Sequence, residues 1–129
     1  MLNRICLLIT LIVILVGCTN PIEKTTGAEQ VNHIVFCWLK EPGNSAHRQK
    51  IIETSRSFRK IPGVIEVRVG EVIPSDRKIV DDSFDVGISL TFANTDDMNI
   101  YLEHPLHKEA VQKVLQPLLK KIVVYDYMG

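Results

Sequence analysis

Residues 31–40 read Val-Asn-His-Ile-Val-Phe-Cys-Trp-Leu-Lys, and the rest of the fold can be inferred outward from this stretch. It is rich in β-branched and aromatic residues and stops at Glu41-Pro42-Gly43, a pattern that predicts a β-strand. Successive side chains of a strand point to opposite faces, and both faces of this one are apolar. One face carries His33, Val35, Cys37 and Leu39, and the other carries Ile34, Phe36 and Trp38. We therefore expect a strand that is covered on both sides.

The segments that follow alternate between helical and strand patterns. Ser45 is a suitable cap for a helix that runs to Lys60, and Ile61-Pro62-Gly63 ends it. Strands are predicted over residues 64–73 and 84–92, with a polar loop between them. In the second of these strands, the side chains expected on one face are Phe84, Val86, Ile88, Leu90 and Phe92.

A broken helix and a last strand complete the chain. Asn94 or Thr95 is expected to cap the helix. His104-Pro105 interrupts it, because proline disfavours the helical conformation at the residue before it. The later elements are a helical stretch over residues 106–116, its end at Pro117, and a strand over residues 122–127.

The order β-α-β-β-α-β is the ferredoxin-like arrangement of the α+β class. Right-handed crossovers place the four strands, numbered along the chain, in the spatial order 4-1-3-2, with the helices on one face of an antiparallel sheet. The open face would then expose a large apolar patch, which includes Phe36, Trp38, Tyr125 and Tyr127. A second copy of the sheet is the simplest cover, so we predict a homodimer in which two subunits form a dimeric α/β barrel.

The first eighteen residues have the layout of an export signal. Arg4 supplies a positive charge, residues 5–16 are apolar except for Thr10, and Leu15-Val16-Gly17-Cys18 follows. The tetrapeptide resembles the bacterial lipobox, whose cysteine receives a diacylglyceryl group and becomes the first residue of the mature protein. The apolar run of about 12 residues is shorter than the ~20 that a membrane span needs. Plain secretion with cleavage elsewhere is the remaining alternative.

We therefore divide the chain into a lipoprotein signal peptide at residues 1–17, a lipidated Cys18 with a flexible tether to residue 30, and one domain at residues 31–129. The expected location is the bacterial cell envelope, where the lipid on Cys18 anchors the protein to the bilayer.

Charge and cysteine content exclude several classes of function. The chain has 15 basic and 15 acidic residues, so its net charge gives no support to nucleic-acid binding. Processing and lipidation leave Cys37 as the single cysteine of the domain, and an internal disulfide is therefore impossible. Because Cys37 lies inside an apolar strand, we expect a buried, unreactive thiol.

Several segments, taken in order, resemble the stress-responsive dimeric α/β-barrel family, often called Dabb. They are residues 31–35, Pro62-Gly63-Val64, Gly70, residues 84–92, Tyr101-Leu102-Glu103-His104-Pro105-Leu106-His107 and residues 123–127. The resemblance implies a ferredoxin-like subunit and a homodimer, in a family with many stress-associated members of unknown chemistry. A polyketide-cyclase branch of the family uses a Tyr and a His from the Y-x-x-H-P-x-H segment, and the matching residues here are Tyr101 and His107.

Four polar residues are expected to meet at one end of a pocket between the sheet and the helices. His33 begins the first strand and Asp126 lies near the end of the last, and antiparallel neighbours would bring these ends together. Tyr101 and His107 flank the break in the helix. An imidazole oriented by a carboxylate is a general base near neutral pH, and a Tyr hydroxyl can polarise or protonate a carbonyl oxygen. This set suits cofactor-free enolisation, aldol-type closure or isomerisation of a small carbonyl compound.

A structural role for the same residues is the competing interpretation. His107 would hydrogen-bond Asp126 and hold the helix break against the sheet, since buried polar groups need partners. His104 is expected to be a cap or turn residue. Apart from His104 and His107, which flank a turn, the sequence has no compact metal-ligand motif. It also has no glycine-rich phosphate loop or dinucleotide fingerprint, so neither a metal nor a cofactor is predicted.

The sequence as a whole predicts a membrane-anchored dimer that binds a small molecule between its helices and its sheet. Two alternatives stay open. One is a structural or stress-response dimer without catalysis, and the other is a cofactor-free enzyme of cyclase, isomerase or monooxygenase type that uses Tyr101 and His107.

Overall fold

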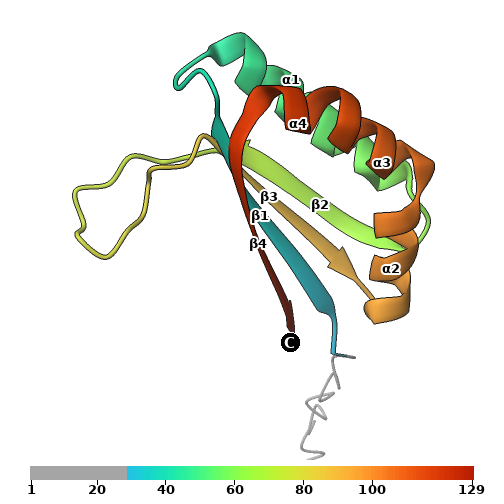
Figure 1. The fold of residues 1–129 in the computed structure, drawn as a ribbon. Helices are drawn as coiled ribbons and strands as arrows, with labels where there is room; N and C mark the ends of the chain where they lie inside the picture. The colour runs from blue at the N-terminus through green and yellow to red at the C-terminus, as the bar shows by residue number, and fades with distance from the viewer. Residues whose placement is uncertain (1–28) are drawn as a thin grey trace, which may run out of the picture.

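The computed structural model describes residues 29–129, which form one antiparallel sheet with helices over one of its faces (Figure 1). The sheet has four strands in the order β2-β3-β1-β4. The strands are β1 (Val31–Leu39), β2 (Val64–Glu71), β3 (Val86–Phe92) and β4 (Leu119–Met128). The helical segments are α1 (Ser45–Arg56), η1 (Ser57–Lys60), α2 (Thr95–Glu103), α3 (Pro105–Ala110), η2 (Val111–Leu115) and α4 (Gln116–Leu118). The predicted ferredoxin-like α+β fold and strand order are confirmed.

The core lies between the sheet and the helices. In β1 and β3 every second residue is buried, and the pairing of Val35 with Ile88 shows that the two buried sets share the helix-covered face. The helices add Ile51 and Phe58 to this core, both at most 1 % exposed. Full burial of each such side chain stabilises the fold by roughly 1.5–3 kcal/mol. This gain explains why the apolar side chains at every second position of these strands face the helices.

The opposite face of the sheet, called the open face below, is apolar on one half only. The half on β1 and β4 carries Ile34, Phe36, Trp38, Val123, Tyr125 and Tyr127. The half on β2 and β3 carries Glu66, Arg68, Gly70, Gly87, Ser89 and Thr91. Tyr125 and Tyr127 are 59 % and 55 % exposed, so the apolar patch expected from the sequence is present in the single chain.

The position of Phe84 differs from the prediction. β3 begins at Val86, and Phe84 lies on the open face with its ring centroid 4.7 Å from that of Phe36 and 6.3 Å from that of Trp38. Asp85 accounts for the difference, because its N–H donates to the Cys37 carbonyl at 2.8 Å and its carboxylate accepts the N–H of Leu39 at 2.8 Å. These bonds turn the chain at Asp85, so the alternation does not extend back to Phe84.

Several ends of elements also differ from the predicted ones. Asn44, and not Ser45, caps α1 by accepting the N–H of His47 at 3.0 Å. Asn94 caps α2 as expected, accepting the N–H of Asp97 at 2.8 Å. Pro117 does not end the last helix, since α4 runs to Leu118 and β4 begins directly after it.

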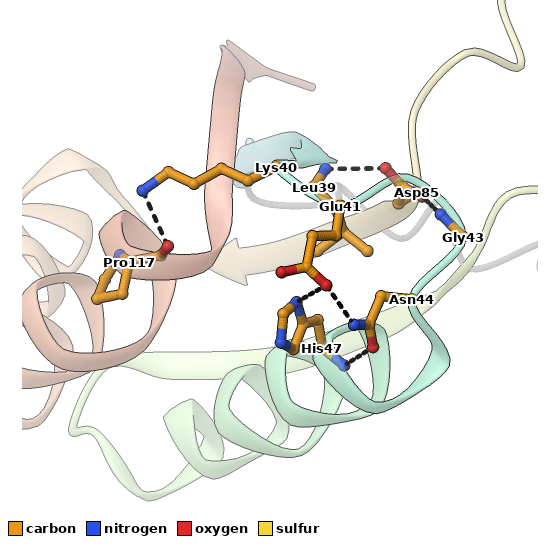
Figure 2. A network of polar contacts seen from close by, with 8 residues as sticks. All are labelled: Leu39, Lys40, Glu41, Gly43, Asn44, His47, Asp85 and Pro117. Atoms are coloured by element: carbon orange, nitrogen blue, oxygen red, sulfur yellow. Dashed lines mark hydrogen bonds and ion pairs between the residues drawn. The ribbon is translucent and has the colours of Figure 1, made fainter.

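A π-helical turn and a contact from Lys40 accompany the proline in the last helix. The π-helical turn η2 brings the N–H of Gln116 to the Val111 carbonyl, and Pro117 has no N–H to continue the pattern. The Lys40 ammonium then donates to the carbonyls of Gln116 and Pro117 at 3.1 and 2.9 Å. Figure 2 shows the bond from Lys40 to Pro117 beside the bonds of Asp85 to Leu39 and of Asn44 to His47, which lie around the end of β1.

The loop between β2 and β3 extends away from the body of the domain (Figure 1). It contains two isoleucines, Ile73 and Ile79, which are 83 % and 92 % exposed. Ser75 and Asp82 close its base through a hydrogen bond of 2.8 Å from backbone N–H to carboxylate.

Candidate functional site

A pocket of about 190 Å³ lies on the helix-covered face, between β1, β3 and β4 on one side and α2, α3 and η2 on the other. Most of its lining is aliphatic or aromatic, and three polar rings border it, those of His33, Tyr101 and His107. The other lining residues are Val35, Phe58, Ile88, Leu90, Leu102, Val111, Leu115, Ile122 and Val124. The pocket therefore lies where the sequence predicted it, and three of the four predicted polar residues line it, while Asp126 does not.

Tyr101 lies at the centre of the polar group. It comes from α2, is 2 % exposed, and its ring centroid is 4.4 Å from that of His107 and 5.8 Å from that of His33. Phe58 and Phe92 pack against the same ring at 5.6 and 5.3 Å between centroids. Burial raises the pKa of the Tyr101 phenol, so the hydroxyl stays protonated and can donate a hydrogen bond at neutral pH.

His33 is paired with the carboxylate of Asp126. The two residues face each other across β1 and β4, and His33 Nδ1 lies 2.6 Å from Asp126 Oδ1. His33 is 6 % exposed, whereas the Asp126 side chain is 45 % exposed because β4 is an edge strand. A carboxylate can only accept, so Nδ1 carries the proton and Nε2 of the neutral ring has a free lone pair.

His107 is oriented by a backbone carbonyl. Its Nδ1 lies 3.0 Å from the Leu102 oxygen, which again places the proton on Nδ1. Burial lowers the pKa of His107, the bond to Leu102 opposes this, and the charge of His33 lowers the pKa further. The ring is therefore held neutral more firmly than a free imidazole. The sequence-based alternative that His107 pairs with Asp126 is wrong, because Asp126 is bonded to His33.

The site thus combines a phenol donor with two imidazoles whose Nδ1 atoms are already engaged. Such a set can bind a ligand that has both donor and acceptor groups, and it can move a proton between an imidazole and a carbonyl or hydroxyl oxygen. Sequence reasoning missed two of its parts. Phe58 packs on both Tyr101 and His107, and its helical spacing from Ile51 was the available signal. The Leu102 carbonyl left no signal, because it depends on the geometry of the helix break.

The structure also bears on the predictions for metal ligands and for Cys37. Within residues 29–129, no three His, Cys, Asp or Glu side chains are grouped closely enough to hold a metal ion. Cys37 is fully buried, as predicted, and burial together with the charge of Asp85 raises the pKa of its thiol to about 12. The thiol therefore remains protonated and unreactive.

The predicted lipid attachment at Cys18 lies outside the described residues. In the part of the chain that the structure describes, none of the helices combines the length and hydropathy that crossing a bilayer requires.

Comparison with known proteins gives one family and many similar structures. The model of the stress responsive A/B barrel domain, Dabb, matches residues 31–129. A hydroxynitrile lyase from Passiflora edulis is 25 % identical with a TM-score of 0.68, over 79 % of this chain and 94 % of that chain. Among curated proteins, the search finds no match.

Two bacterial structures are similar at lower identity. A Dabb family protein with a ferredoxin-like fold from Mesorhizobium loti is 22 % identical with a TM-score of 0.65, over 78 % of this chain and 97 % of that chain. A dimeric ferredoxin-like protein of unknown function from Thermobifida fusca is 16 % identical with a TM-score of 0.64, over 80 % of this chain and 93 % of that chain. Residues 31–129 therefore correspond to nearly the whole of these solved chains.

Proposed function

The chain belongs to the stress responsive A/B barrel domain family, and from that premise we propose that it binds a small, mostly apolar molecule in the pocket beneath its helices. The observation that carries the proposal is the meeting of three polar rings, those of His33, Tyr101 and His107, in a lining that is otherwise apolar. Small-molecule sites have this composition, in which apolar walls supply affinity and a few polar groups fix the orientation.

The size of the pocket limits the ligand. An apolar cavity of about 150 Å³ accepts benzene, so the 190 Å³ here suits one aromatic ring or a short branched chain with a polar substituent. The Tyr101 hydroxyl is the natural partner of a carbonyl oxygen, and an imidazole Nε2 is the natural partner of a hydroxyl. Ligands of the aldehyde, ketone and alcohol classes therefore fit best.

Binding can be tested with three probes of the same shape: toluene, benzaldehyde and benzyl alcohol. Chemical-shift titrations of residues 31–129 should show the two oxygen-containing probes bound more tightly than toluene. Val111→Phe should block all three, because Val111 lines the pocket. Val114→Phe is the matched control, since Val114 lies in the same turn and is also half-buried but is not part of the lining. Equal effects of the two variants would argue against this pocket as the site.

Acid–base catalysis on the bound molecule is the second candidate function. It is favoured by the short His33–Asp126 contact of 2.6 Å and by the similarity to a hydroxynitrile lyase. In such a reaction an imidazole takes the hydroxyl proton of a hydroxynitrile, the carbon–carbon bond to the nitrile breaks, and the leaving cyanide receives a proton. The same groups serve enolisation or isomerisation of a carbonyl compound.

In the catalytic proposal, Tyr101 and His107 act on the reacting molecule. Their effect on turnover can be measured separately from their effect on the stability of the fold. Aldehyde release from an aromatic hydroxynitrile should fall at least about 100-fold in Tyr101→Phe and in His107→Ala, the lower range for loss of a general acid or base. The melting temperature should change little in Tyr101→Phe, which keeps the ring. A fall in melting temperature without a change in turnover would favour the structural role.

We further propose that two copies associate through the open face. The apolar half of that face and the description of similar solved proteins as dimeric support this. Sedimentation of residues 31–129 at micromolar concentration should give twice the subunit mass, and a monomer would contradict the proposal.

We propose, finally, that a lipid on Cys18 anchors the dimer to the bacterial cell envelope. The support is the order of charge, apolar run and lipobox-like tetrapeptide in residues 1–18. In a bacterial host, an alkyne fatty acid should label the chain and Cys18→Ser should abolish the label. Labelling that survives Cys18→Ser would place the lipid elsewhere.

A further inference from the structure

The break between α2 and α3 leaves the Leu102 carbonyl without its helical partner. In a continuous helix the N–H of Leu106 would bond the carbonyl of Leu102, four residues earlier. His104 precedes Pro105 and is extended, with ψ at 136°, so the helix cannot continue through it. The N–H of Leu106 donates instead to Nδ1 of His104 at 3.1 Å. The Leu102 carbonyl is thereby left for another donor.

His107 supplies that donor. Its Nδ1 is 3.0 Å from the Leu102 oxygen, and this contact is what places the proton on Nδ1 and the lone pair on Nε2. If Leu106 recovered its helical bond to Leu102, the carbonyl would be shared and the preference of His107 for one tautomer would weaken. The helix break and the protonation pattern of a pocket residue are therefore coupled through one oxygen atom.

We propose that His104 and Pro105 are positioning residues that set the tautomer of His107, so that the pocket meets a ligand hydroxyl with an unprotonated Nε2. The statement about the ligand rests on the proposed small-molecule function, but the tautomer is a property of the free protein. His104 itself must be the opposite tautomer, because its Nδ1 accepts a hydrogen bond and its proton is on Nε2. His33 has its proton on Nδ1, as His107 does, but its partner is the carboxylate of Asp126.

The three histidines give an internal standard for the test. Long-range ¹H–¹⁵N spectra of the full chain in detergent solution distinguish protonated from unprotonated ring nitrogens. In the native protein we expect the proton on Nδ1 in His33 and His107, and on Nε2 in His104. His33 should keep its tautomer in every variant below, because its partner lies on β4.

Pro105→Ala permits the helix to continue, and His104→Ala removes the acceptor for Leu106. Each should shift the tautomer ratio of His107 by up to about tenfold, the factor for complete loss of one hydrogen bond of roughly 1.4 kcal/mol. His104→Asn should restore the native ratio, since Asn accepts at the same helix position. Asn94→Ala removes the cap of the neighbouring α2 and is the control for a general loss of helix stability, with no change expected at His107.

A native His107 tautomer in both Pro105→Ala and His104→Ala would overturn the proposal. If His104→Ala fails to fold, Pro105→Ala decides alone, because alanine is well tolerated in a helix. Binding is read separately. Pro105→Ala should weaken benzyl alcohol about tenfold and leave toluene unchanged. If benzyl alcohol does not bind the native chain, the proposed function fails, and the tautomer measurement still decides this inference.

Discussion

The two faces of the sheet are built from the same strands but differ in how far the rest of the chain covers them. β1 places His33 and Val35 on the helix-covered face, where both are less than 10 % exposed, and Phe36 and Trp38 on the open face, where both remain partly exposed. On the covered face the helices of the same chain shield the side chains from solvent, and the buried polar group of His33 has a partner in Asp126. On the open face, Phe84 packs on Phe36 and Ser83 accepts the indole N–H of Trp38. The comparison shows that alternation decides which residues share a face, while the rest of the chain decides whether that face becomes an interior or an interface.

The largest expected difference between the faces concerns neighbouring residues of β3. Leu90 is fully buried beneath the helices, and its replacement by Ala should lower the free energy of unfolding by about 2–5 kcal/mol through lost contacts and a cavity. Ser89 lies next to it on the open face, and Ser89→Ala should change the free energy by less than about 0.5 kcal/mol. Urea denaturation of residues 31–129 measures both. Comparable losses would mean that the open face is packed as tightly as the core.

Removing an aromatic ring from the open face should act on association. Tyr125 is 59 % exposed in the single chain, and Tyr125→Ala should weaken a dimer by roughly 2 kcal/mol, or about 30-fold in Kd. Ile100→Ala is the control, since Ile100 is 51 % exposed on a helix of the covered side. Sedimentation over a range of concentrations gives both constants. An unchanged Kd in Tyr125→Ala would move the interface away from this half of the sheet.

The polar pairs of the two faces should also differ. Asp126→Ala leaves the buried His33 N–H without a partner, at a cost of about 1–1.5 kcal/mol, the lower part of the usual range because the carboxylate is 45 % exposed. Glu66→Ala removes the partner of Arg68 on the open face, where both side chains are exposed and solvent screens the pair, so the free energy of unfolding should change much less. Thermal unfolding of both variants at the same pH compares the two losses of stability. The reverse order would show that His33 finds another acceptor.

The smallest expected effect is the loss of stability when the pH is lowered. Burial is the main cause that lowers the pKa of His107 in the folded chain below its unfolded value of about 6.5, so folding favours the neutral ring. The contribution of His107 to stability is complete above that unfolded value and is lost as the pH falls below it, because the unfolded chain then binds a proton that the folded chain resists. His107→Gln should reduce this loss between pH 7 and pH 5, measured as the difference in stability between variant and native chains. The same slope in both would exclude His107 as its source.

The parts of the fold that sequence predicted are those controlled by local periodicity. The alternation in β1 and β3 assigned nearly every side chain to its face, and proline marked the break at His104. The failures have non-local causes. Phe84 left the alternation because Asp85 bonds to β1, and the helix passes Pro117 at a place where Lys40, directly after β1, donates to the Pro117 carbonyl.

The site shows the same division. Its four polar residues were predicted from strand ends and from the helix break. The structure places His33, Tyr101 and His107 in the pocket lining, and Asp126 bonds to His33 from outside that lining. The meeting of His33 with Asp126 followed from the expected antiparallel pairing of the first and last strands, and the structure has it. The acceptor for His107 could not be predicted, because it is a backbone carbonyl that the helix break leaves without its helical partner.

The ends of β1 and β4 have a mechanical consequence. Gln30 and Gly129 are joined by two backbone hydrogen bonds of 3.2 and 3.0 Å, so the domain is entered and left at the same end of two antiparallel neighbours. Force applied between these points would load the bonds one pair at a time and open the two strands like a zipper, instead of shearing the whole ladder at once. A tether before residue 30 and a load after residue 129 would therefore detach β4 first, and with it Asp126 and one wall of the pocket.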